Sequence, residues 1–207
     1  MSFIIKDTKN NIARLTIDRP EAMNAMNEVV LNELESAIRS CIDDKSVGVM
    51  IISGSGDKAF VAGADIKKMQ KIGPDEALVF AKAGQGLTLT IENSPKPIIA
   101  AVNGYALGGG CEISLACHIR VCSDNAMFGQ PEVLLGILPG WGGTQRLPKI
   151  VGLGLANEII TTGRMVKSSE AKEIGLVNHV VSQDQLITKC EEIANQILKN
   201  GPDAIAE

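Results

Sequence analysis

Short apolar runs rich in β-branched residues alternate along this chain with segments of helical periodicity. The clearest run covers residues 47–53 and is bounded by turn residues, a second covers 97–102, and a further strand is predicted at 119–122. Continuous apolar runs of this length are typical of strands buried on both faces of a parallel sheet. Apolar residues at helical spacing predict helices over 27–38, 75–92, 110–117, 142–150, 153–161, 168–174 and 184–199. This alternation predicts an α/β fold with parallel pairings, preceded by a strand pair at 4–5 and 12–17 that turns at Asn10 and Asn11.

Composition limits the class of protein. The chain has 207 residues, of which 45% are hydrophobic, and no low-complexity linker divides it, so we expect a single domain over 1–207. A net charge of −4 and an aromatic content of 3% argue against a nucleic-acid partner. No run of eighteen apolar residues predicts a membrane span, and the first residues enter a strand pattern at once, without a signal or transit segment.

The cysteine pattern indicates the redox environment of the protein and does not indicate a metal site. They number five, include no C-x-x-C pair and have only two histidines to join them, so the spacing does not indicate a metal centre. Reduced thiols in a cytoplasmic compartment are the expectation.

Two glutamates in glycine-rich, apolar surroundings are the candidate catalytic groups. Glu112 follows the triple glycine 108–110, and Glu132 closes the segment F-G-Q-P-E twenty positions later. Burial raises the proton affinity of a carboxylate toward the range useful for acid–base catalysis. Two plainer interpretations remain open: Glu112 as a first-turn acid that complements the helix dipole, and Glu132 as a solvent-facing cap.

Free backbone N–H groups are expected beside the first glutamate. Gly109 lies three residues before Glu112, so both belong to one face of a first helical turn. A carbonyl held by the Gly109 N–H would lie close to the Glu112 carboxylate. An oxyanion hole needs a second donor, and the loop 61–67 is its candidate source, with Asp65 as the cap of a following helix.

A competing motif points to a nucleotide. Gly54, Gly56 and Ala59 fit the pattern G-x-G-x-x-G/A after a strand. That fingerprint requires a helix to open directly from the loop, whereas residues 60–64 contain β-formers and another glycine. The sequence therefore favours a turn here. The segment 139–143 can likewise be interpreted as purely structural, a tight connection in which Trp141 packs in the core.

Taken together, the motifs resemble the crotonase (enoyl-CoA hydratase/isomerase) family, and short-chain enoyl-CoA hydratases most of all. They are D-R-P-E-A-M-N-A-M at 18–26, A-G-A-D-I-K at 62–67, A-V-N-G-Y-A-L-G-G-G-C-E at 101–112, F-G-Q-P-E at 128–132, G-I-L-P-G-W-G-G-T-Q-R at 136–146 and G-L-V-N at 175–178. The resemblance runs in order over essentially the whole chain. It implies a spiral of repeated ββα units, with the core at about 1–190 and a truncated C-terminal helical region starting at about 184–207.

The resemblance also implies a chemistry, that of an enoyl-CoA hydratase in fatty-acid β-oxidation. Ala64 and Gly109 would hold the thioester carbonyl of a 2-enoyl-CoA, Glu112 would activate water for addition at C3, and Glu132 would move the proton at C2. Substrate contacts would come from the loop 62–67 and from the glycine-rich loop near 140, at Ala62, Asp65, Ile66, Lys67, Gly140 and Trp141. No cofactor is implied, since CoA arrives with the substrate.

Two departures from the family pattern stand out, and two alternative functions remain. Glu21 stands where many relatives carry a basic residue near the CoA end, with Lys67 and Lys68 as alternative phosphate contacts. The resemblance also implies further C-terminal helices that help to cover the acyl pocket and to form trimers or hexamers, and we expect these helices to be missing from residues 1–207. The alternatives to a hydratase are an isomerase of the same family and a non-catalytic acyl-CoA-binding or assembly subunit.

Overall fold

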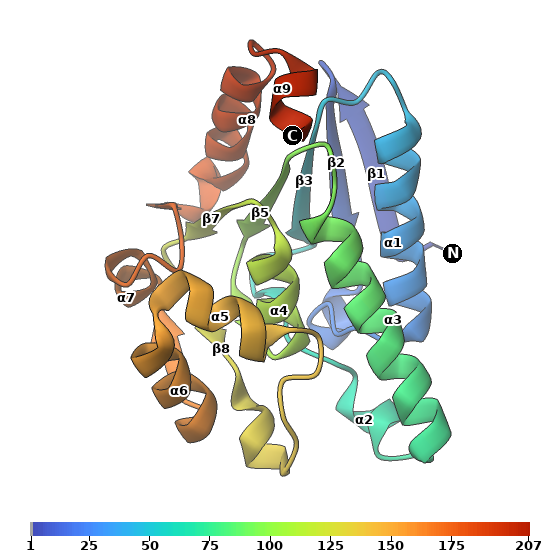
Figure 1. The fold of residues 1–207 in the computed structure, drawn as a ribbon, viewed down its shortest axis with the longest axis vertical. Coiled ribbons are helices and arrows are strands. Elements are labelled where there is room, and N and C mark those ends of the chain that lie inside the picture. Colours follow the sequence, from blue (N-terminus) through green and yellow to red (C-terminus); the bar gives the residue numbers. More distant parts are fainter. Residues whose placement is uncertain (1) are drawn as a thin grey trace.

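Ten strands form two sheets within residues 2–207, the part of the chain that the computed structural model describes, the side chain of Lys67 excepted (Figure 1). The larger sheet has six strands in the order β1 (Ile4–Lys9), β2 (Ile12–Ile17), β3 (Val49–Gly54), β5 (Ile98–Val102), β7 (Ile119–Ser123) and β10 (His179–Val181). The smaller has four in the order β4 (Ala59–Val61), β6 (Tyr105–Leu107), β8 (Met127–Gly129) and β9 (Met165–Lys167). Pairing is parallel except at β1–β2 and β8–β9, which are antiparallel.

The order of the strands reveals a repeated unit. β3, β5 and β7 of the larger sheet continue into β4, β6 and β8 of the smaller sheet, respectively. After β4 and β6, helices return the chain to the larger sheet at β5 and β7, whereas the helices after β8 lead to β9 of the smaller sheet. This is the predicted spiral of ββα units. The smaller sheet places β4, β6 and β8 side by side, so segments far apart in the sequence become neighbours there.

Helices occupy most of the remaining chain. The α-helices are α1 (Glu28–Asp43), α2 (Ile66–Met69), α3 (Pro74–Glu92), α4 (Gly109–Ala116), α5 (Gly143–Val151), α6 (Leu153–Thr162), α7 (Ser168–Glu173), α8 (Leu186–Ile197) and α9 (Pro202–Ala206). Short 3-10 helices cover Pro20–Ala22, Pro131–Leu135 and Gln183–Gln185. Asn27 caps α1 by accepting a hydrogen bond from the N–H of Val30, as expected for an asparagine before an apolar periodic segment.

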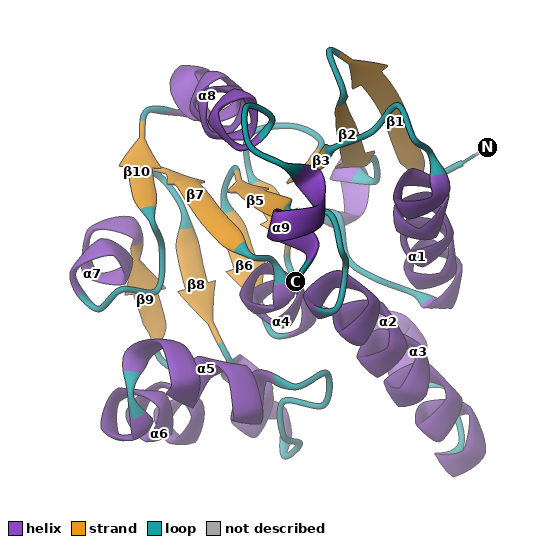
Figure 2. Ribbon diagram, turned by 45° about the horizontal axis from the view of Figure 1, so that its top comes forward, coloured by secondary structure: helices purple, strands orange, loops and turns teal. Residues whose placement is uncertain are grey.

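Helices cover both faces of the larger sheet (Figure 2). Alternate residues of β3 and β5 belong to two separate clusters, Met50 and Ile98 on one face and Val49 and Ile99 on the other. α1, α3 and α4 contribute to the first cluster, and α8 covers the second. This explains why these strands read as continuous apolar runs rather than alternating ones.

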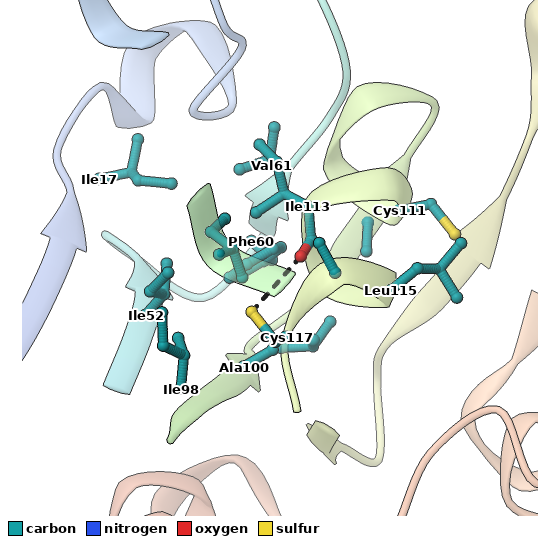
Figure 3. Packing of buried hydrophobic residues seen from close by; sticks show 14 of the residues in the cluster. Ile17, Ile52, Phe60, Val61, Ile98, Ala100, Cys111, Ile113, Leu115 and Cys117 are labelled. Atoms are coloured by element: carbon teal, nitrogen blue, oxygen red, sulfur yellow. Dashed lines mark hydrogen bonds between the residues drawn. The ribbon is translucent and has the colours of Figure 1, made fainter. Parts of the chain in front are cut away.

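α4 lies at the centre of the larger cluster (Figure 3). Its Ile113 and Leu115 pack among side chains from both sheets, including Ile52 and Phe60. Cys117, at the end of α4, is buried, and its Sγ lies 3.4 Å from the carbonyl oxygen of Ile113. All eight residues of α4 are buried, so the position of its first turn is set by packing on every side.

Most of the predicted elements are present, and the main omissions share a cause. The predicted helices and the long strands match the structure to within a few residues, and Asn10 and Asn11 make the expected turn with positive φ angles of 52° and 62°. The three-residue strands β4, β6, β8, β9 and β10 were not predicted, because so short a segment carries little periodicity. The segment after Gly54 is a turn that leads into β4, as favoured above, and no helix opens from it. Among the helices of residues 2–207, none is long and apolar enough to cross a bilayer.

Candidate active site

Glu112 lies in the first turn of α4 with its carboxylate turned toward a distant loop. The residue is 2% exposed, and its Oε1 accepts hydrogen bonds from the backbone N–H groups of Trp141 (2.7 Å) and Gly143 (2.8 Å). Burial raises the pKa of Glu112 above its ordinary value, while the two N–H donors oppose that rise. Glu112 is therefore more than a first-turn acid: the loop before α5 orients it.

Glu132 lies in the 3-10 helix Pro131–Leu135 and is 9% exposed, so the solvent-facing alternative was wrong. Within residues 2–207 its buried Oε2 has no hydrogen-bond partner. Burial raises the pKa of Glu132 to about 7, and the negative charge of Glu112 adds to the rise. A carboxyl group with this pKa gains and loses a proton readily at neutral pH.

The peptide units Gly108–Gly109 and Gly63–Ala64 are each oriented by a hydrogen bond to the carbonyl oxygen. The carbonyl of Gly108 accepts the N–H of Glu112 (2.9 Å), and the carbonyl of Gly63 accepts the N–H of Met26 (2.9 Å). Because the C=O and N–H of a trans peptide point in opposite directions, the N–H groups of Gly109 and Ala64 face away from these partners. Neither N–H has an acceptor within the described chain. An oxyanion hole requires two free donors of this kind.

A cavity of about 350 Å³ brings these groups together. Ala64, Gly109, Glu112 and Glu132 all line it. The rest of its wall is mainly apolar and comes from α2, α3 and the segment after Glu132, including Ile66, Phe80, Leu135, Ile137, Leu138 and Trp141. An acid–base pair and two backbone donors at an apolar cavity form a site that can stabilise an oxyanion while moving protons.

The predicted substrate contacts divide between two cavities. Ala62, Ile66, Gly140 and Trp141 line the first. Asp65 instead lines an adjoining cavity between α1, α2 and α3, where it also caps α2 through the N–H of Lys68, as predicted. The side chain of Lys67 lies outside the described part of the structure. Glu21 is exposed.

Trp141 is held at both its backbone and its ring. Its carbonyl accepts hydrogen bonds from Thr88 Oγ1 and from Arg146 Nη1, each at 2.9 Å. Its ring packs on Gly84 and Gly109, where an added Cβ would lie 2.2 Å from ring atoms. The tight-connection interpretation is therefore correct in part, since the ring does pack in the core, but the same residue's N–H orients Glu112.

Sequence reasoning missed several residues that support the glutamates. Arg146 is buried and links Trp141 to Glu92, with Nη2 2.6 Å from the Glu92 carboxylate. Gln130 is fully buried, and its Nε2 lies 3.4 Å from the carbonyl oxygen of Gly108. Both stand inside the quoted motifs, so the available signal was a polar residue in an apolar, glycine-rich segment. Among the described residues, no three His, Cys, Asp or Glu side chains are grouped to hold a metal ion.

Comparison with known proteins agrees with this geometry. A family model described as enoyl-CoA hydratase/isomerase matches residues 7–207. The chain is 49% identical over 202 residues to a crotonyl-CoA hydratase of Syntrophomonas wolfei, covering 98% of this chain and 78% of that protein. It is 47% identical over 202 residues to a short-chain-enoyl-CoA hydratase of Clostridium acetobutylicum, covering 98% and 77%.

Solved structures agree as well. The structure of an enoyl-CoA hydratase from Bacillus anthracis is similar with a TM-score of 0.97 at 38% sequence identity, covering 99% of this chain and 80% of that one. The fold is thus that of the crotonases. Sequence and structure together show that this chain belongs to the enoyl-CoA hydratase/isomerase family.

Proposed function

We propose that the protein adds water across the 2,3 double bond of a 2-enoyl-CoA and forms a 3-hydroxyacyl-CoA. The observation that carries this proposal is the placement of two buried glutamates, both with raised pKa, beside two free backbone N–H groups in one cavity. The names of the relatives from S. wolfei and C. acetobutylicum support a hydratase and favour a short acyl chain.

The oxyanion hole is assigned to Ala64 and Gly109. Their N–H groups would donate to the thioester oxygen, which becomes negative as water attacks C3 and the double-bond electrons move toward the carbonyl. Donors aimed at a developing charge lower the barrier because they bind the transition state more strongly than the substrate.

The two glutamates divide the proton transfers. Glu112 as a carboxylate would take a proton from water as the C3–O bond forms, and its Oε1 is already held by Trp141 and Gly143. Glu132, whose pKa of about 7 keeps a large share protonated near neutral pH, would give its proton to C2 as the enolate collapses. Glu112 would then release its proton to water and Glu132 would take one up from water, which restores both groups.

The binding contacts and partners are part of the same proposal. Ala62, Asp65, Ile66, Lys67, Gly140 and Trp141 would contact the acyl-CoA, which brings CoA as part of the substrate, so no metal or separate cofactor takes part. We also propose one domain over 1–207, a cytoplasmic location, and assembly into trimers or hexamers when further C-terminal helices are present.

The test follows the absorbance of the conjugated thioester of crotonyl-CoA. Loss of absorbance with formation of 3-hydroxybutyryl-CoA is the expected result. A parallel assay supplies a 3-enoyl-CoA: conversion of this compound without hydration of crotonyl-CoA would show an isomerase instead. Binding of crotonyl-CoA with neither conversion would show a non-catalytic acyl-CoA-binding protein.

A further inference from the structure

The guanidinium of Arg19 joins two segments that meet beside the proposed oxyanion hole. Arg19 follows β2 in the chain, and its side chain is 17% exposed. Its Nη2 donates to the Asp65 carboxylate at 2.9 Å, and its Nη1 donates to the carbonyl oxygen of Ala25 at 3.0 Å. The planar fork of an arginine offers the two acceptors separate nitrogens in a fixed geometry, which the single ammonium nitrogen of a lysine does not reproduce.

The two acceptors flank the backbone bridge that orients Ala64. Met26 and Ala64 form an isolated parallel bridge, in which the Met26 N–H donates to the Gly63 carbonyl and the Asp65 N–H donates to the Met26 carbonyl. Ala25 precedes one side of this bridge and Asp65 follows the other. Arg19 therefore holds the two segments of the bridge in register. The Gly63 carbonyl of this bridge in turn fixes the direction of the Ala64 N–H.

The bridge needs such support because one of its two segments has an unusual backbone. Met23 and Asn24 both have positive φ angles, 52° and 57°, a region that side-chain-bearing residues rarely adopt. Asn24 is fully buried, and its amide donates to the carbonyls of Ser55 and Ala59 while its Oδ1 accepts the N–H of Arg19. The turn is thus fastened at its middle by Asn24 and at its exit by the side chain of Arg19.

We propose that Arg19 is a positioning residue for the Ala64 half of the oxyanion hole, acting through Ala25 and Asp65 on either side of the Met26–Ala64 bridge. This inference rests on the proposed hydratase function. It gives the motif D-R-P-E-A-M-N-A-M a role in catalysis without contact with the reacting atoms.

These variants distinguish misalignment of the oxyanion hole from a general loss of folded structure. Arg19→Gln removes the charged fork, and Arg19→Lys keeps the charge but loses the two separate nitrogens that now bind Ala25 and Asp65. Asp65→Asn retains an oxygen for the cap of α2, which Asp65 Oδ1 now provides to the Lys68 N–H, yet weakens the bond to Arg19. Arg164→Gln is the control, because Arg164 is also partly buried and bonds two carboxylates, Glu158 and Glu170, away from the bridge. Far-UV circular dichroism establishes that each variant is folded.

Two measurements report on the oxyanion hole itself. The first is kcat and KM for hydration of crotonyl-CoA. The second is the absorption maximum of bound 4-(dimethylamino)cinnamoyl-CoA, a push–pull chromophore that absorbs at longer wavelength when its carbonyl accepts hydrogen bonds. A change that only loosened the fold would not reduce this wavelength shift in a folded, ligand-saturated protein.

The expected result is a fall in kcat of about 10- to 100-fold for Arg19→Gln, the range for a misplaced catalytic contact, with a smaller change in KM. Arg19→Lys and Asp65→Asn should lie between this variant and wild type, and the red shift should shrink in the same order. Arg164→Gln should match wild type in both readouts.

Two outcomes would overturn the inference, and they differ. Wild-type kcat and red shift in Arg19→Gln and Asp65→Asn, or an equal fall in Arg164→Gln, would refute the role of Arg19 and leave the hydratase proposal standing. Absence of both hydration and red shift in wild type would refute the hydratase proposal, and this inference with it.

Discussion

The backbone N–H of Trp141 donates a 2.7 Å hydrogen bond to the carboxylate of Glu112, 29 positions earlier in the chain. The ring of the same tryptophan packs on Gly109, whose N–H is assigned to the oxyanion hole. Trp141 thus contacts residues of both proposed functions: its backbone binds Glu112, the proposed base, and its ring packs on Gly109, a proposed oxyanion donor. Its position should therefore affect catalysis even when the overall fold is unchanged.

Gly84→Ala tests this dependence. An added Cβ would lie 2.2 Å from the Trp141 ring, so the ring or α3 must move. We expect a loss of about 1–3 kcal/mol in the free energy of unfolding, typical of overpacking, together with a lower kcat. Gly86→Ala on the same helix is the matched control: its Cβ would make only an ordinary 3.8 Å contact, so a gain of about 0.5–1 kcal/mol and an unchanged kcat are expected. Equal stability of the two variants in urea unfolding would contradict the account.

The raised pKa of Glu132 predicts how stability depends on pH. Between the ordinary value of 4.5 and the folded value of about 7, the folded protein keeps a proton that the unfolded chain has released. The free energy of unfolding should therefore fall as pH rises through this window, by about 3 kcal/mol in total from this group. Urea unfolding at pH 5 and pH 8 measures the change, and Glu132→Gln should remove this part of it. An identical pH dependence in wild type and Glu132→Gln would argue against a buried carboxyl group of raised pKa.

The same proton predicts the alkaline side of the activity profile. Hydration requires Glu132 to be protonated, so kcat/KM, which reports the titration of the free enzyme, should fall as pH rises beyond an apparent pKa near 7. The measurement is kcat/KM for crotonyl-CoA from pH 5 to pH 9. A kcat/KM that keeps rising to pH 9 would show that Glu132 does not supply the proton.

The sequence was a good guide to the long elements because their patterns are strong. β3 and β5 are continuous apolar runs, and α3 has helical spacing over 19 residues, so local pattern and tertiary structure agree. The smaller sheet is different. β4, β6 and β8 have three residues each, too few to show alternation, and the sheet forms only because the spiral stacks them.

The sequence predicted the main residues of the candidate site better than it predicted the contacts between them. Glycine-rich, apolar surroundings indicated that Glu112 and Glu132 are buried, and this is confirmed. Sequence could not decide the orientation of Glu132, because a proline at the start of a helical turn is common both on surfaces and in interiors. Nor could it pair the Glu112 carboxylate with the N–H groups of Trp141 and Gly143, since that pairing depends on how the loop before α5 packs against α4.

The measurement that tests the central claim most directly is kcat for crotonyl-CoA hydration in Glu112→Gln and Glu132→Gln. Loss of a positioned acid or base typically costs about 10²–10⁴-fold in rate, so each variant should fall by at least about 100-fold while circular dichroism stays unchanged. Glu173→Gln, which alters an exposed glutamate of α7, should keep the wild-type rate. Near-normal turnover in both active-site variants would contradict the assignment of Glu112 and Glu132 as the acid–base pair.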